Sequence, residues 1–149
     1  VPDAHDDAVA AAREALAVAS ASGGGETEAA LIARQTLGVV LGKAGRFDDA
    51  EAELRRVFEA TWHAQGAIRE SWRICLFASS YAGALADLGR HDEALALADA
   101  AIARAREGVA PDHPVHRRLA ENALTIATKP VALKMRPDDP VYCFHPEVL

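Results

Sequence analysis

Residues 41–50 of the chain, LGKAGRFDDA, recur 44 positions later as LADLGRHDEA at residues 85–94. The second half of this stretch occurs a third time as HDDA at residues 5–8, which is 42 positions before FDDA at residues 47–50. Repetition at such an interval is typical of a fold built from stacked supersecondary units.

Each copy predicts a helix, a tight turn and a second helix. Gly45 and Gly89 follow apolar residues at helical spacing, where a glycine can adopt the left-handed conformation that ends a helix. The acidic residues after each glycine would lie in the first turn of the next helix, beside the positive end of its dipole. We therefore expect about six antiparallel helices, the last capped by Asp112, over residues 5–21, 26–43, 47–64, 68–88, 91–107 and 113–128.

The composition favours closely packed helices and argues against several classes of protein. Of the 149 residues, 34 are Ala and only 5% are aromatic, and Ala is the best helix former. A net charge of −6 without a run of Lys and Arg argues against direct nucleic-acid binding. No apolar stretch approaches the ~20 residues of a membrane span, so we expect no membrane association. Two cysteines are too few for a disulfide framework, which favours a cytoplasmic location.

The repeated units resemble the tetratricopeptide repeat, whose pattern is W-x2-L-G-x2-Y, followed by A-x3-F and P. The first unit matches with Arg34-x2-Leu37-Gly38-x2-Leu41, Gly45 and Ala50-x3-Leu54, and the second with Ala78-x2-Tyr81-Ala82-x2-Leu85, Gly89 and Ala94-x3-Ala98. Both units lack the Trp, and their period of 42–44 residues exceeds the usual 34. The longer period is similar to the kinesin-light-chain type of repeat, which is also common in bacterial regulators.

This resemblance implies an all-α, tetratricopeptide-like solenoid over residues 1–128, with an extended tail that we define as residues 129–149. The solenoid would consist of a half unit at 5–21, whole units at 26–64 and 68–107, and a half unit at 113–128. In the family, the first helix of each unit lines a concave surface along which a partner peptide lies. The resemblance thus implies a non-catalytic scaffold for a protein or peptide partner, with no cofactor.

The candidate groove residues share one face of the three first helices when these are aligned at Leu37, Tyr81 and Leu124. Three polar side chains at one equivalent position would form a ladder able to bond an extended peptide: Gln35, Ser79 and Asn122. The following turns add four further candidates: Val39, Gly83, Lys43 and Asp87. A solvated helix face explains the same column of residues, and both interpretations stay open.

The tail holds residues that disordered segments normally avoid, among them Tyr142, Cys143 and the only Met. We expect it to dock on helical surface, either at the end of the stack or in a groove of its own or a neighbouring chain. A second hypothesis is that Tyr142-Cys143-Phe144-His145 binds a metal ion or is modified by another enzyme.

Other features have a structural and a functional interpretation. The chain could be a sensor or oligomerisation module of a longer regulator, with homo-oligomers formed through the open ends of the solenoid. His113-x2-His116 has a spacing that could share a metal ion, although two ligands make a weak site. Trp62 and Trp72 could stack on a ligand, but core packing explains them equally, and Cys75 is expected to be an inert core thiol.

Overall fold

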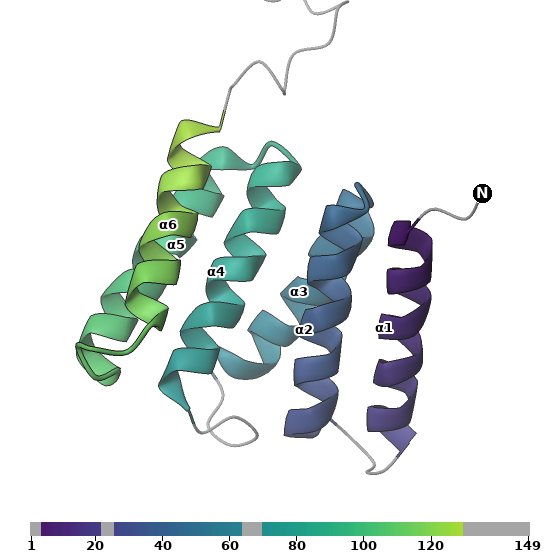
Figure 1. Cartoon of the computed structure of the whole chain (residues 1–149). Helices are drawn as coiled ribbons and strands as arrows, with labels where there is room; N and C mark the ends of the chain where they lie inside the picture. The colour runs from purple at the N-terminus through teal and green to yellow at the C-terminus, as the bar shows by residue number, and fades with distance from the viewer. Residues whose placement is uncertain (1–3, 22–25, 64–69, 130–149) are drawn as a thin grey trace, which may run out of the picture.

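The computed structural model describes residues 4–21, 26–63 and 70–129 of the chain. These residues form six α-helices and no strand: α1 (Ala4–Ala21), α2 (Glu28–Lys43), α3 (Phe47–Thr61), α4 (Ser71–Asp87), α5 (His91–Gly108) and α6 (Val115–Thr128). Helices α2, α4 and α6 lie side by side in one layer, α3 and α5 lie behind them, and α1 lies beside α2 (Figure 1). The predicted all-α helical repeat fold is confirmed.

The two glycine turns are nearly identical in the structure. Gly45 and Gly89 have φ values of +80° and +81°, the left-handed conformation that the repeat predicts. After each glycine, the next backbone N–H reaches back five residues, from Arg46 to Leu41 and from Arg90 to Leu85, and closes the helix end. Both turns therefore reverse the chain in the same way, and α3 and α5 pack antiparallel to α2 and α4.

Helix starts depart from the prediction where the local capping differs. Helix α2 begins at Glu28 instead of residue 26, because the Thr27 hydroxyl accepts the Ala30 N–H at 3.2 Å and acts as the N-cap. The expected cap on α6 was wrong. Helix α6 begins at Val115 with Pro114 at the N-cap position, and the Val115 N–H donates to Nδ1 of His113 at 3.0 Å, so no bond from Asp112 starts the helix.

The core consists of four clusters of buried residues, mainly small and medium apolar side chains, that lie between the packed helices. Leu37 and Leu41 of α2 pack against Val9 and Ala12 of α1, which places α1 on the stack. Ala94, Ala98, Ala101 and Ala105 of α5 are all fully buried. Alanine at these positions lets α5 approach α4 and α6 closely, which gives the high Ala content a structural role.

An arginine after each turn glycine connects neighbouring units. Arg46 forms an ion pair with Asp6 of α1 at 2.6 Å, and Arg90 lies 3.7 Å from Glu51 of α3. Each arginine thus contacts an acidic residue on an earlier helix of the stack: Arg46 contacts α1, and Arg90 contacts α3. The acidic partners stand at different positions of the repeat, because Asp6 aligns with Asp48 and Glu51 aligns with Val9 at an offset of 42 residues.

Candidate functional site

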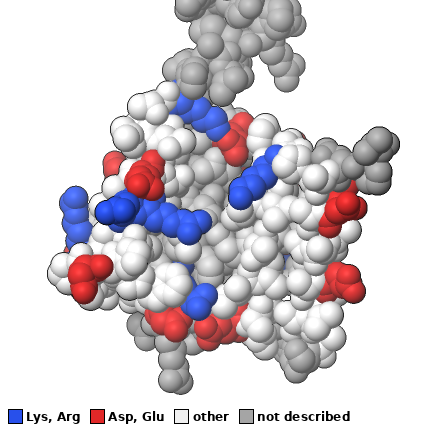
Figure 2. Space-filling view, viewed as in Figure 1, with Lys and Arg blue, Asp and Glu red and all other residues white. Residues whose placement is uncertain are grey.

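A groove of about 320 Å³ lies on the face formed by α2, α4 and α6 (Figure 2). Between α2 and α4 its floor is apolar and includes Val39 and, from α3, Leu54. The hydroxyl-bearing residues Ser79 and Ser80 belong to α4. Gly42 of α2 and Gly83 of α4 leave the backbone open to the groove, since neither glycine has a side chain.

Positive charge borders the groove on two sides. Lys43 contributes from α2 and Arg118 from α6, and α4 lies between these two helices (Figure 1). Neither side chain has a hydrogen bond or ion pair with any described residue. The acidic residue of the lining, Asp87, is paired with Lys129 directly after α6. This groove is therefore locally cationic although the chain carries a net charge of −6.

The lining residues do not form an acid–base pair. Asp87 is already neutralised by Lys129, and the described lining includes no His or Cys. General acid–base catalysis requires a titratable group placed within hydrogen-bond reach of the reacting atom. The groove has the surface chemistry of a binding site: an apolar floor, hydroxyl groups and two cations.

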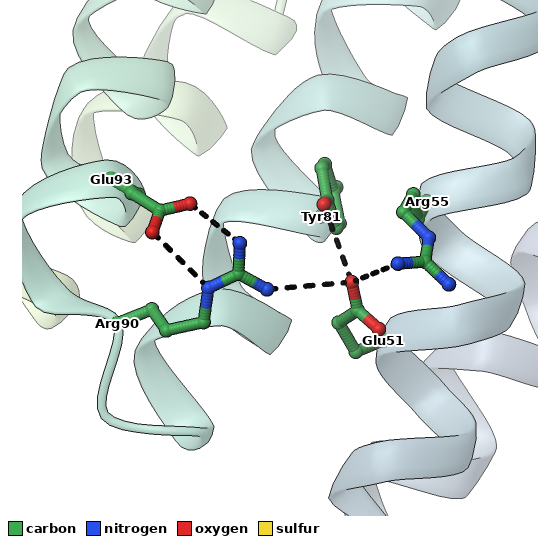
Figure 3. Close-up of polar contacts among 5 residues, drawn as sticks. All are labelled: Glu51, Arg55, Tyr81, Arg90 and Glu93. Carbon is green, nitrogen blue, oxygen red and sulfur yellow. Dashed lines mark hydrogen bonds and ion pairs between the residues drawn. The ribbon is translucent and has the colours of Figure 1, made fainter.

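A second polar cluster lies between α3 and α4, around the buried carboxylate of Glu51 (Figure 3). Its Oε1 atom accepts a hydrogen bond from the Tyr81 hydroxyl at 3.3 Å and lies 3.6 Å from Arg55 and 3.7 Å from Arg90. Burial, together with the nearby Glu51 carboxylate, raises the pKa of Tyr81 above its usual value near 10. A phenol with a raised pKa stays protonated at neutral pH and is a poor base. The contacts of Glu51 join α3 to α4 and to Arg90, which follows the turn at Gly89.

The comparison with known families agrees with this architecture. A family model described as a tetratricopeptide repeat matches residues 80–115. The chain carries a tetratricopeptide repeat. The matched segment covers the end of α4, the turn at Gly89, all of α5 and the first residue of α6. No curated protein matches the chain.

Tetratricopeptide repeats generally mediate contacts between proteins, and the family is typically non-catalytic. Within the part of the chain that the structure describes, no helix is long and apolar enough to cross a membrane. The long-period, kinesin-light-chain-like type stays a prediction.

The structure brings most of the candidate residues together. Six of them line the groove: Val39, Lys43, Ser79, Gly83, Asp87 and Asn122. The seventh, Gln35, does not line it and is only 8% exposed, and its side-chain oxygen has no hydrogen-bond partner among the described residues. The seven positions therefore do not form one continuous row, because Gln35 turns into the helix packing.

The expected polar ladder is in part used within the protein. The Asn122 amide donates to the Ser79 carbonyl oxygen at 2.8 Å and to the Ser79 hydroxyl at 2.6 Å. This pair joins α6 to α4, and Ser79 is only 4% exposed. The amide donors of Asn122 are consequently directed at Ser79, and the more accessible polar groups of the groove are those of Lys43 and Arg118.

Arg118 is a groove residue that the sequence alignment missed. Arg117 and Arg118 are adjacent basic residues of α6. Only Arg118 lines the groove, because it precedes Asn122 by four residues and so lies on the same face of the helix. The spacing of four from an aligned residue was the signal that could have identified it.

The remaining candidates have structural roles in this fold. The His113 ring accepts a hydrogen bond from the Val115 N–H, and the His116 ring contacts the Ala110 carbonyl oxygen. Among the described residues there is no group of three metal-ligating side chains. Arg104 lies 4.5 Å from the ring centre of Trp62, and His113 lies 5.3 Å from that of Trp72. Burial raises the pKa of the Cys75 thiol, which keeps it protonated. Tyr142, Cys143 and His145 lie outside the described residues.

Proposed function

We propose that this chain is a non-catalytic scaffold that binds an extended segment of a protein partner in the groove between α2, α4 and α6. The observation that carries the proposal is the composition of the groove: open backbone at Gly42 and Gly83, an apolar floor around Val39 and Leu54, and two cations that have no ion pair among the described residues. An extended segment can place apolar side chains on such a floor and bring its backbone close to a glycine. The membership in a family of interaction repeats supports the same conclusion.

Gly83→Leu should block this binding without unfolding the protein. A Cβ atom at position 83 would lie 3.9 Å from Oδ1 of Asn122, an ordinary contact, so the helix accepts it. The rest of the leucine side chain would fill the groove, while replacement of a mid-helix glycine favours the helix by up to about 1 kcal/mol. We expect the affinity for a groove peptide to fall at least about tenfold, or ~1.4 kcal/mol, with no decrease in melting temperature.

The probe is a peptide selected on the intact chain from a phage-displayed library of random sequences, with its Kd measured by calorimetry. Ala96→Leu is the matched control, because Ala96 is exposed on α5 in the opposite layer. This control should bind the peptide with the affinity of the unmodified chain. Equal affinity of the unmodified and Gly83→Leu chains would show that peptides bind elsewhere and would refute the groove model.

Self-association is a second candidate function, favoured by apolar residues exposed on the two terminal described helices. Val18 of α1 is 67% exposed and Leu124 of α6 is 65% exposed. An α-solenoid repeat buries its apolar face against the next unit, so a second copy of the chain could cover these residues. Light scattering over a range of concentrations tests this: a mass that stays at 15.8 kDa would eliminate it.

A further inference from the structure

We propose that the groove is occupied, in the absence of a partner, by residues 138–144 of the same chain, DDPVYCF. This inference rests on the proposed function, since it assigns a competitor to the same binding groove. The segment lies outside the described residues, whereas the groove and the end of α6 are described.

Helix α6 delivers the chain to one end of the groove. Helices α2, α4 and α6 run in the same direction, so Lys43, Asp87 and Lys129 lie near the same end of the layer (Figure 1). The ion pair between Lys129 and Asp87 holds the last described residue against a residue of the groove lining. Lys129, after which the tail continues in the sequence, therefore lies at the groove and not on the opposite layer.

The length of the connecting chain is sufficient for this docking. From Lys129 to Asp138 there are nine residue steps, which can span up to about 30 Å when extended. The groove follows α4 from Asp87 back to Leu76, a distance of about 16 Å at 1.5 Å per residue. The segment can thus turn back at the end of α6 and run along the groove antiparallel to α4.

The charges of segment and groove are complementary. Asp138 and Asp139 bring two negative charges, and Lys43 and Arg118 have no partner among the described residues. A cationic site in a chain of net charge −6 attracts anionic groups, and an ion pair formed next to an apolar floor is less screened than one in open solvent. The acidic pair matches Lys43, which lies at the end of the groove that the chain reaches first, whereas Arg118 lies in the first turn of α6, toward the other end.

The residues after the acidic pair match the floor. Val141, Tyr142 and Phe144 are apolar or aromatic, and Pro140 favours the extended backbone that a groove between helices accepts. Residues at alternate positions of an extended segment point to the same side, so Tyr142 and Phe144 can face the floor together. The linkage within one chain gives an effective concentration in the millimolar range, so a partner segment must displace residues 138–144 to bind.

Cys143 provides a direct test in the full-length chain. Cys75 is fully buried with a raised pKa, so a thiol-specific nitroxide label should attach to Cys143 alone, and a Cys143→Ser chain should remain unlabelled. Paramagnetic broadening of backbone amide signals is then recorded by NMR. We expect strong broadening at Gly42, Gly83 and Asn122, and none at Asp99 on α5. Broadening restricted to other surfaces, or spread evenly over the chain, would overturn the proposal.

Two variants and one mixing experiment complete the test. Lys43→Glu with Arg118→Glu should abolish the broadening, whereas Arg106→Glu with Arg117→Glu, of equal charge change but outside the groove, should preserve it. Asp138→Asn with Asp139→Asn, which alters no described residue, should weaken it. A mixture of labelled chain with unlabelled, isotope-enriched chain should show no broadening; broadening there would assign the segment to a second copy and overturn the intramolecular docking. If docking fails while Gly83→Leu still blocks peptide binding, the proposed function stands alone.

Discussion

Gly38→Ala should lower the free energy of unfolding by about 1–3 kcal/mol, whereas Gly42→Ala, one turn further along the same helix, should raise it by up to about 1 kcal/mol. A Cβ atom at position 38 would lie 2.5 Å from two carbon atoms of Leu54, which is 3% exposed and has little room to move. At position 42 the nearest atom is the Ala50 Cβ, 3.9 Å away. Urea unfolding followed by circular dichroism measures both changes.

The second unit suggests a rescue of this substitution. The positions equivalent to Gly38 and Leu54, 44 residues later, are Ala82 and Ala98, and both are buried in one cluster with Leu54. One unit thus combines glycine with leucine, and the other combines two alanines. In a double-mutant cycle, Gly38→Ala should cost less in a Leu54→Ala background, with a coupling of about 1 kcal/mol or more. Additive losses would show that Leu54 does not set the requirement for glycine.

Glu51→Gln should lower the free energy of unfolding by about 1–3 kcal/mol, because the buried carboxylate is the shared partner of Tyr81, Arg55 and Arg90. The two arginine side chains are 49% and 45% exposed, and water therefore compensates part of the loss. Chemical unfolding at neutral pH measures the effect.

Glu93→Gln is the matched control for Glu51→Gln. Glu93 binds Arg90 at 2.7 Å but its side chain is 59% exposed, so its substitution should cost less than about 1 kcal/mol. A second measurement is the ultraviolet titration of tyrosine. Glu51 raises the pKa of Tyr81 through its charge and its hydrogen bond, so Glu51→Gln should move that pKa down toward 10. Equal losses for both variants would contradict the account of the buried cluster.

The sequence predicted the repeat architecture because its decisive signals are local. A glycine that follows an apolar helix ends it by adopting the left-handed conformation, and Gly45 and Gly89 both adopt this conformation. Helix types and positions follow from the spacing of apolar residues, and the bounds of α1, α2, α3, α5 and α6 agree within about three residues. Helix starts were less certain because a single side chain decides them, as Thr27 and His113 do.

The groove was predicted less completely, because its properties depend on how helices rotate about their axes. Alignment of first helices found residues at equivalent positions, but it could not show that Gln35 turns into the packing or that Asn122 bonds to Ser79. The alignment also did not identify Arg118 as a groove residue, because its position depends on the rotation of α6 about its axis. The division of the chain into units and half units stays a prediction.

The central claim is that the groove between α2, α4 and α6 is the binding surface, and a titration of the isotope-enriched chain with the selected peptide tests it most directly. Amide chemical shifts report contact residue by residue in the intact protein. The account predicts the largest shifts at Val39, Gly42, Gly83 and Asn122, with α5 residues such as Asp99 unchanged. Largest shifts on α3 or α5, with the groove amides unmoved, would contradict it.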